Sequence, residues 1–339
     1  MPRRLARALG PIAGLTLGAC TFAGPNLPIT SVAPAAHRAS GASTEFVGFW
    51  ESWSDTNRND AFYRLQSVPG SVTSVDVAFS IADGNEISPP QNTYPLQPGA
   101  KRVHARGGRL LLSFGGATSP FDITDPPLFA ANLRTYAKAH PKLYDGFDFD
   151  DEVIPSNGPQ QLVDVILAVR QAFPSAVISF DAFVDGADAQ PGSGHQGEDI
   201  PVIEQAGSAI DYVNVMAYDQ YGWKPPGDPN CSYQEGSQDD CRLDVLKQFA
   251  SIQQSGGGDF SEKKIVLGLM IGEADDGEVI TAKDASGYAR EIRRRGYRGM
   301  MIWDLDRDNP QAPPNGTGDP KGTYVHAIAH ALGTKGQRR

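Results

Sequence analysis

Residues 144–152 read Tyr-Asp-Gly-Phe-Asp-Phe-Asp-Asp-Glu, so acidic residues alternate with aromatic ones through most of the segment. Side chains at positions i, i+2 and i+4 of a β-strand lie on one face. The pattern therefore predicts that the carboxyls of Asp148, Asp150 and Glu152 converge at the end of one strand. Because like charges repel where water is partly excluded, at least one of the three should hold a proton near neutral pH. A carboxyl that holds a proton there can act as a general acid.

Two simpler interpretations of this acidic segment fit less well. A calcium loop also uses Asp-x-Asp spacing, but the intervening residues are Phe147 and Phe149, and the glycine that such a loop needs for its sharp turn is missing. A plain surface strand would place either these rings in water or the carboxylates in a core. The segment favours an active-site strand, and we expect neither a metal nor a cofactor.

The pattern Asp-Gly-x-Asp-x-Asp-x-Glu, which begins at Asp145, resembles the signature of glycoside hydrolase family 18. That family contains the chitinases and the endo-β-N-acetylglucosaminidases. Three further segments are similar to its motifs in type and order. These are Ser113-Phe-Gly-Gly116 for the third strand, Met216-Ala-Tyr-Asp219 for the sixth strand, and Trp303 for the tryptophan that closes the last strand. The resemblance extends over residues 46–308.

Short β-rich runs alternate with amphipathic segments from residue 45 onward. The predicted strands cover residues 46–53, 74–80, 109–116, 144–152, 176–184, 212–219, 264–271 and 297–305. Predicted helices include residues 128–140, 161–173, 244–254 and 285–295. Eight strands in alternation with helices predict an α/β fold, a single closed (β/α)8 TIM barrel with its chemistry at the carboxyl ends of the strands. Residues 275–296 leave room for one helix, so we expect no inserted α+β subdomain of the kind that long-cleft chitinases carry.

The resemblance implies a mechanism in which the substrate's own acetamido carbonyl, rather than an enzyme carboxylate, attacks the anomeric carbon. Glu152 is then the general acid that protonates the leaving oxygen and later activates water. Asp150 holds the acetamido N–H, and Asp148 behind it shares a proton with Asp150. Tyr218 hydrogen-bonds the acetamido oxygen, although a buried tyrosine satisfied by a neighbour is the alternative for this residue.

Other residues are expected to bind the sugars. The resemblance implies that Asp219 touches the same sugar as Tyr218 and that Trp303 forms the floor beneath it, and Met216 comes from the same motif as Asp219. All four tryptophans, Trp50, Trp53, Trp223 and Trp303, fall at or just after the end of a predicted strand. Flat aromatic rings suit the C–H faces of sugars, so we assign Trp50 and Trp223 to substrate binding as well, although packing is the commoner role of any single tryptophan.

Composition limits the class of partner. The chain has 339 residues, of which 30 are basic and 40 acidic, and its net charge is -10. This excess of acidic residues argues against nucleic acid as a partner and is compatible with a neutral sugar polymer such as chitin or another N-acetylglucosamine-containing glycan. Nothing in the sequence indicates an oligomer, and we expect a monomer.

The amino terminus has the layout of an export signal. Three arginines at positions 3, 4 and 7 precede an apolar stretch over residues 8–19, which is too short to span a bilayer. Leu17-Gly-Ala-Cys20 resembles a bacterial lipobox, so we expect residues 1–19 to be a signal peptide, Cys20 to be lipidated and residues 20–44 to be a flexible spacer. The catalytic barrel should cover residues 45–334, with a basic tail over residues 335–339. A simple signal peptide and secretion are the alternative.

Cys231 and Cys241 are the other two cysteines, and they lie in a loop rich in Pro, Gly, Asp and Asn. In an exported protein a nearby pair predicts a disulfide. Zinc is the alternative, but the chain offers no further Cys or His pair nearby at ligand spacing.

We interpret the chain as an exported, lipid-anchored chitinase. The rival is an endo-β-N-acetylglucosaminidase that cuts the chitobiose core of N-glycans, since the string Asp-Phe-Asp-Asp-Glu at residues 148–152 resembles those enzymes. Within this string Asp151 should point away from the barrel interior, and the sequence assigns it no role. A sugar-binding relative without catalysis is a second alternative, but its usual mark is a substituted acid, and Glu152 is present.

Overall fold

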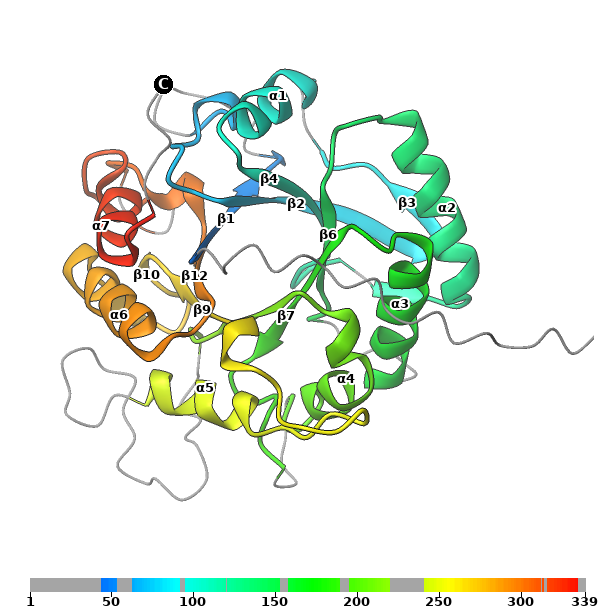
Figure 1. Ribbon diagram of the computed structural model, residues 1–339. Coiled ribbons are helices and arrows are strands. Elements are labelled where there is room, and N and C mark those ends of the chain that lie inside the picture. The colour runs from blue at the N-terminus through cyan, green and yellow to red at the C-terminus, as the bar shows by residue number, and fades with distance from the viewer. Residues whose placement is uncertain are drawn as a thin grey trace, which may run out of the picture. The chain divides into compact units, whose positions relative to one another are not determined.

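The computed structural model describes residues 44–53, 63–91, 95–119, 121–152, 158–189, 195–219, 241–311, 313 and 316–334. Within these residues, parallel strands close into the predicted barrel (Figure 1). Its eight strands are β1 (Glu45–Glu51), β2 (Ser74–Gly84), β4 (Arg109–Gly115), β6 (Gly146–Asp150), β7 (Val177–Phe183), β8 (Tyr212–Met216), β9 (Ile265–Met270) and β12 (Gly299–Trp303). Each pairs with the next in this order, and β1 pairs with both β2 and β12, which closes the barrel. The sequence prediction of a (β/α)8 TIM barrel is confirmed.

Helices form a layer outside the strands (Figure 1). They are α1 (Gln97–Ala105), α2 (Pro126–Ala139), α3 (Pro159–Ala172), α4 (Asp199–Ala206), α5 (Arg242–Ala250), α6 (Ala282–Arg295) and α7 (Thr323–Leu332). Single turns of 3-10 helix occur at η2 (Leu65–Ser67), η3 (Gly207–Ala209), η4 (Glu262–Lys264) and η5 (Leu305–Arg307). Two short strands, β3 (Glu86–Ser88) and β5 (Phe121–Ile123), pair with the end of β2. The four helices predicted from the sequence correspond to α2, α3, α5 and α6.

Local sequence signals set the ends of these helices. At the start of α6, the side chain of Thr281 accepts a hydrogen bond from the backbone N–H of Asp284, and the Asp284 carboxylate accepts one from that of Thr281. This reciprocal capping satisfies two donors that a helix start leaves free. The same helix ends at Gly296, whose φ of 80° is the left-handed conformation that glycine adopts without strain.

The apolar core has two layers, because successive side chains of each strand point to opposite faces. Phe46 and Trp50 of β1 pack outward against the helical layer, whereas Val47 and Phe49 point into the barrel. The barrel interior also contains buried charge. Glu45 is 1% exposed and accepts hydrogen bonds from the side chains of Arg109 and Arg298.

Only small elements separate the last two barrel strands, in a segment that is described throughout. They are the hairpin formed by β10 (Gly272–Glu273) and β11 (Val279–Ile280), followed by α6. An inserted α+β subdomain is therefore absent between β9 and β12, as the sequence predicted.

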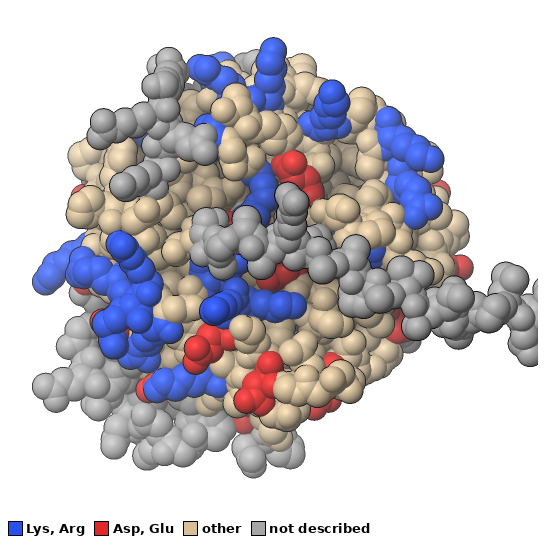
Figure 2. Space-filling view, in the orientation of Figure 1, with Lys and Arg blue, Asp and Glu red and all other residues tan. Residues whose placement is uncertain are grey.

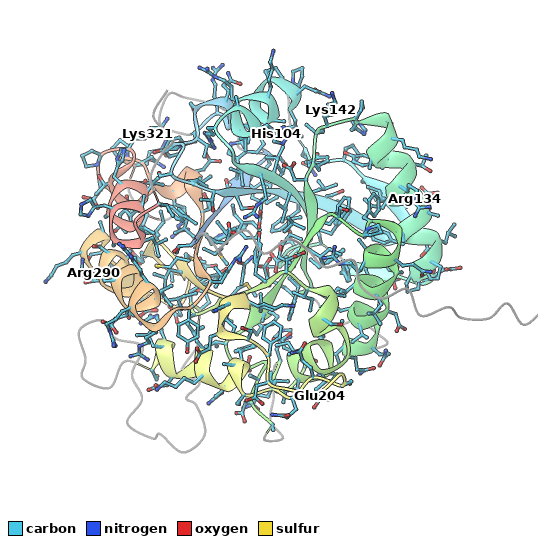
Figure 3. The ribbon with its side chains drawn as sticks, in the orientation of Figure 1. His104, Arg134, Lys142, Glu204, Arg290 and Lys321 are labelled. Atoms are coloured by element: carbon cyan, nitrogen blue, oxygen red, sulfur yellow. The ribbon has the colours of Figure 1, made fainter. Side chains whose placement is uncertain are left out.

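Charged side chains of the helical layer point outward, as Arg134 on α2 and Arg290 on α6 do in Figure 3. Lys and Arg side chains gather over α6 in Figure 2. The last turn of α6 carries arginines at positions 293–295, where the negative end of the helix dipole favours cations. Among the described residues, no helix has both the length and the apolar character that crossing a bilayer requires.

Candidate active site

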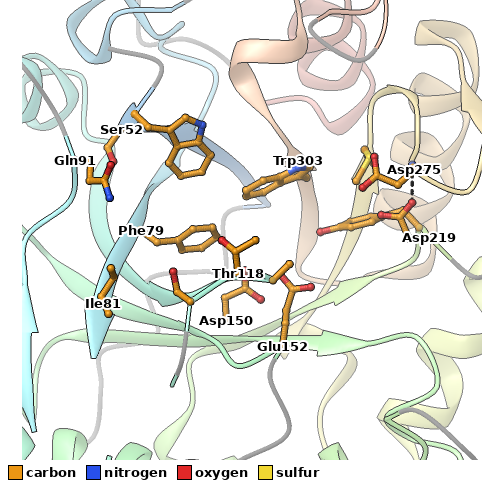
Figure 4. A pocket seen from close by; sticks show the side chains of 15 residues that line it. Ser52, Phe79, Ile81, Gln91, Thr118, Asp150, Glu152, Asp219, Asp275 and Trp303 are labelled. Carbon is orange, nitrogen blue, oxygen red and sulfur yellow. Dashed lines mark hydrogen bonds between the residues drawn. The ribbon is translucent and has the colours of Figure 1, made fainter. Parts of the chain in front are cut away.

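A pocket of about 400 Å³ lies at the carboxyl ends of the barrel strands (Figure 4). Its lining comes from seven of the eight barrel strands or from the loops that follow them. The lining residues are Ser52, Trp53, Phe79, Ile81, Gln91, Ala117, Thr118, Ser119, Asp150, Glu152, Tyr218, Asp219, Met270, Asp275 and Trp303. This is the face where a barrel of this type carries its chemistry.

The acidic segment forms β6 and the turn after it. Phe147 and Phe149 pack into the outer core, and the alternation of side chains turns Asp148 and Asp150 into the barrel. Asp148 is fully buried, Asp150 is 3% exposed, and Glu152, two residues beyond the strand, is partly exposed in the pocket. The structure therefore places the three carboxyls in line along one face, with Asp148 beneath the pocket and the other two in its wall.

Asp148 is held by both neighbouring strands. Ser113 Oγ of β4 donates to it at 2.7 Å, and Ser179 Oγ of β7 donates at 2.6 Å. Sequence reasoning missed a fourth acid, Asp181 of β7, whose two carboxyl oxygens are buried without a hydrogen-bond partner among the described residues. Burial, followed by the charges of Asp148 and Asp150, raises the pKa of Asp181 well above its ordinary value. Protonation beneath the pocket therefore involves Asp181 as well as the two acids of the motif.

Asp150 is also kept from ionising. Burial, followed by the negative charges of Glu152, Asp148 and Asp151, raises its pKa well above the ordinary value. Its Oδ1 is buried and has no hydrogen-bond partner among the described residues. The residue lines the pocket with the small part of its surface that stays exposed, so its carboxyl can receive an N–H group from a ligand.

Two glycines let β4 pack against this acidic strand. A Cβ at Gly115, whose φ is +111°, would lie 2.0 Å from the carbonyl oxygen of Asp150. A Cβ at Gly116, whose φ is +87°, would meet the ring of Phe79 at 2.5 Å. The Ser-x-Gly-Gly motif therefore serves the packing beneath the pocket.

Glu152 has the properties of a general acid. Its pKa is raised from 4.5 to about 7, mainly by burial and to a smaller extent by the charge of Asp219, whereas a hydrogen bond from the backbone N–H of Ala117 opposes the rise. A carboxyl with this pKa is about half protonated at neutral pH, so it can both give and take a proton there.

Tyr218 and Asp219 follow β8 and line the pocket together with Glu152. Burial raises the pKa of the Tyr218 phenol well above its ordinary value, so the phenol keeps its proton. Asp219 has a φ of 53°, and its Oδ1 accepts the backbone N–H groups of Asp275 at 2.8 Å and Asp276 at 3.2 Å. Asp219 thereby fixes the loop after β9 and brings Asp275 to the pocket rim.

Three rings form an aromatic shelf along one side of the pocket: Trp53, Phe79 and Trp303. The ring centroids of Phe79 and Trp303 are 5.7 Å apart, and those of Trp53 and Phe79 are 6.0 Å apart, with both pairs stacked. Trp53 is 37% exposed. A shelf of this kind offers the flat apolar surface that pyranose rings contact. Phe79 was not recognised in the sequence, although its place near the end of a predicted strand was a usable signal.

Trp50 does not belong to this shelf, and its assignment to substrate binding is wrong. It is 1% exposed in the outer core, and its indole N–H donates to the carbonyl oxygen of Tyr63 at 2.8 Å. Its position in β1 turns it toward the helices, whereas Trp53 reaches the pocket because the chain leaves the strand after Glu51. Met216 is 5% exposed and packs inside the barrel with Tyr218 and Trp303, so it supports the pocket and does not line it.

Asp151 points away from the three aligned acids. Burial, followed by the charge of Glu198 just before α4, raises its pKa to about 8. Its Oδ1 is buried without a hydrogen-bond partner among the described residues. It does not line the pocket, and the structure assigns it no part in the chemistry.

Several predicted residues lie outside the part of the chain that the structure describes. They are Cys20, Trp223 and Cys231, together with residues 1–43 and 335–339. Cys241 is buried just before α5, and its disulfide with Cys231 stays a prediction. The one group of three carboxylates close enough to share a cation, among the described residues, lies behind the pocket and not in the acidic strand.

Solved structures similar to this chain share its barrel. A GH18 chitinase from Pseudoalteromonas aurantia aligns with a TM-score of 0.63 at 18% identity, over 85% of this chain and 100% of that chain. Active domain 2 of a thermostable chitinase from Pyrococcus furiosus aligns with a TM-score of 0.64 at 22% identity, over 88% and 97%. A chitinase from Rhizomucor miehei aligns with a TM-score of 0.60 at 15% identity, over 85% and 99%. At these identities the likeness shows a common fold.

Sequence comparison with curated proteins finds no match. The family model of the glycosyl hydrolases family 18, however, matches residues 45–275, which is more than half of the chain and contains the whole acidic strand with Glu152. The chain therefore belongs to glycoside hydrolase family 18, and it is a glycosidase.

Proposed function

We propose that the protein hydrolyses β-1,4-linked N-acetylglucosamine chains, as a chitinase does, by substrate-assisted catalysis that retains the anomeric configuration. One observation carries the proposal: Glu152, with a pKa of about 7, lines the same pocket as Asp150 and Tyr218, beside the aromatic shelf. Around one site, Glu152 supplies a proton donor, Asp150 a hydrogen-bond acceptor and Tyr218 a hydrogen-bond donor. No other described pocket residue combines ionisation near pH 7 with a place at the end of a barrel strand.

The chemistry begins with the glycosidic bond. Glu152 gives its proton to the leaving oxygen while the acetamido carbonyl oxygen of the same sugar attacks the anomeric carbon, so that the glycosidic bond breaks and an oxazolinium ion forms. Asp150 accepts the acetamido N–H with its carboxyl, and Tyr218 donates to the acetamido oxygen. The ionised Glu152 then takes a proton from a water molecule whose oxygen attacks the anomeric carbon. The bond between this carbon and the acetamido oxygen breaks, which opens the oxazolinium ring and restores the acetamido group. Each attack inverts the anomeric carbon, so the product keeps the β configuration.

The choice of chitin rests on the shape of the site and on its relatives. No inserted subdomain between β9 and β12 encloses the pocket on that side, which suits a long polymer. The Pyrococcus furiosus chitinase domain that shares this fold was crystallised with chito-oligosaccharides. The aromatic shelf offers consecutive sugar rings a continuous apolar face.

Parallel digests test the substrate. The protein is incubated with chitin oligomers and with a high-mannose glycoprotein, and products are identified by mass spectrometry. Shortened oligomers with an unchanged glycoprotein support the proposal. If the glycoprotein is cut within its chitobiose core while the oligomers stay intact, the substrate is an N-glycan and not chitin. If neither substrate is cut, the result favours a sugar-binding protein.

We also propose that the protein is exported and anchored by a lipidated Cys20. The supporting observation is the order of three arginines, a short apolar run and Leu17-Gly-Ala-Cys20. Cys20→Ser should move the protein from the membrane fraction to the soluble fraction. A variant that still sediments with membranes would contradict the lipid anchor.

A further inference from the structure

Positive charge gathers at the amino-terminal end of the barrel, which lies opposite the pocket. The helices run back against the strands, so this end is built from the last one or two turns of helices α1 to α6 and from the loops into the next strands. These segments are residues 101–109, 134–146, 168–177, 204–212, 247–265 and 290–299. Together they contain 16 Lys and Arg residues and six Asp and Glu residues. Figure 2 shows Lys and Arg side chains over α1, α2 and α6.

The rest of the barrel carries the opposite charge. The chain as a whole has 30 basic and 40 acidic residues, so its net charge of -10 does not reveal this division. Residues 44–334 outside the six segments contain 34 Asp and Glu residues and seven Lys and Arg residues. Four of these acids, Asp150, Glu152, Asp219 and Asp275, line the pocket. The two ends of the barrel therefore differ strongly in charge.

Most of the basic side chains at the amino-terminal end are open to solvent, since ten of the 16 are exposed. Acidic neighbours neutralise some of them, as Glu291 does where it pairs with Arg294 and Arg295. The helix dipole favours cations in a last helical turn, which explains part of the pattern. It does not explain Lys142 and Lys263, which are exposed in the connections that follow α2 and α5. The basic end therefore exceeds what helix stability requires.

The chain enters the barrel at this same end, because β1 begins at Glu45. Residues 20–44 join β1 to Cys20, the residue that we propose to be lipidated. A flexible spacer of this length, as the sequence predicts, has a root-mean-square span of about 25–30 Å. Such a spacer keeps the amino-terminal end of the barrel close to the membrane but does not fix its orientation. Residues 335–339, which follow α7, add one lysine and two arginines to the sequence.

We propose that the basic amino-terminal end of the barrel docks on an anionic phospholipid surface, so that the anchored protein holds its pocket away from the membrane. The inference rests on the lipid anchor proposed above, beside which a basic patch acts as a second membrane signal. Each Lys or Arg at such a surface strengthens binding about fivefold. Because salt screens charges beyond about 8 Å, the acidic residues at the pocket end do not cancel this attraction. They are repelled when the pocket end turns toward the bilayer.

Lysine labelling on vesicles tests the orientation. The lipidated full chain is placed on vesicles of phosphatidylcholine, alone or mixed with phosphatidylglycerol, and is treated with an amine reagent that does not cross membranes. We expect Lys142 and Lys263 to react several-fold more slowly on the anionic vesicles. The exposed Lys283 and Lys321, near the starts of α6 and α7 at the other end, should react equally on both. Equal labelling of Lys142 on both vesicles, or equal slowing at both ends, would overturn the proposal.

Charge variants separate the docking face from the anchor. In the full Cys20→Ser chain, the double variant Lys142→Gln/Lys263→Gln should bind the anionic vesicles about 25-fold more weakly than its parent. Lys283→Gln/Lys321→Gln is the matched control and should keep the affinity of the parent. Both double variants should keep the wild-type kcat on a soluble chitin oligomer, since none of the four lysines lines the pocket. Sodium chloride at about 0.5 M should abolish the preference of the parent for anionic vesicles.

The anchor and the docking face fail in different ways. A wild type that does not bind neutral vesicles would refute the anchor, whereas the comparison of the double variants still decides the docking face. A Cys20→Ser chain that binds neutral and anionic vesicles equally would overturn the docking face. So would a control double variant that loses as much affinity as Lys142→Gln/Lys263→Gln. Binding to a soluble polyanion such as heparin, without a preference for anionic vesicles, would assign the basic end to an anionic polymer instead of a membrane.

Discussion

Replacing Glu152 by glutamine removes the proposed acid with almost no change in shape. At pH 7 a carboxyl with its ordinary pKa of 4.5 would be protonated in about one molecule in 300, whereas a pKa of about 7 makes it protonated in about half. The surroundings of Glu152 therefore raise the fraction of active acid about 150-fold. General acid catalysis is typically worth about 100- to 10,000-fold, and we expect Glu152→Gln to lose kcat within that range while still binding substrate.

The assay is the pH dependence of kcat/KM with a soluble chitin oligomer. Because the acid must be protonated in the free enzyme, kcat/KM should be level below pH 7 and fall about tenfold per pH unit above it. Thermal melting supplies the control for folding. A raised pKa means that ionised Glu152 costs stability above pH 7 and costs none below pH 4.5, so Glu152→Gln should melt at pH 8 no lower than the wild type.

Two results would refute this reasoning. A kcat close to that of the wild type in Glu152→Gln would remove the residue from the mechanism. A basic limb near pH 4.5 in the wild type would show that the pocket does not raise the pKa of the acid.

Asp150→Asn should lower kcat on the order of 100-fold, because one of the two carboxyl oxygens that can accept the acetamido N–H becomes an NH2 donor, and its basic limb should stay at the wild-type pH; unchanged kcat would contradict the role of Asp150. Gly115→Ala should cost more than about 2 kcal/mol of unfolding free energy in denaturant titration, since its Cβ would lie 2.0 Å from the Asp150 carbonyl oxygen. Gly277→Ala, with a φ of +84° and nothing within 4 Å, is the matched control and should cost about 1 kcal/mol or less. Trp303→Ala should raise KM roughly 10-fold more than it lowers kcat, because it removes one end of the aromatic shelf; an effect on kcat alone would contradict a binding role.

The barrel, and the alignment of Asp148, Asp150 and Glu152 on one face of a strand, were predictable because each depends on a short repeating pattern in the sequence. A period of two in β6 decides which side chains enter the barrel, and the same alternation placed Asp148, Asp150 and Glu152 correctly. It also explains the error at Trp50. The predicted strand was extended through Trp53, so Trp50 and Trp53 were both counted as residues near a strand end. Side chains alternate within β1, however, and this alternation points Trp50 toward the helical layer.

Contacts between distant segments were harder to predict from the sequence. Asp181 was inside a correctly predicted strand, and its parity with Ser179 could have placed it beside Asp148, but nothing local marks it as a buried acid beneath the pocket. Asp275 reaches the pocket only through the hydrogen bond to Asp219, 56 positions earlier in the chain. The group formed by Glu51, Asp304 and Asp306 exists only once the first strand pairs with the last. Closure of the barrel brings such residues together, and the local periodicity of the sequence does not reveal these contacts.

The central claim is that the acetamido group of the substrate acts as the nucleophile, and the anomeric form of the first product tests it most directly. Proton NMR of a chitin oligomer digest, recorded before mutarotation, should show the β anomer in excess, because attack by the acetamido oxygen and then by water gives two inversions. An initial excess of the α anomer would show a single inversion by water and contradict the mechanism, even though the chain folds as a family 18 barrel.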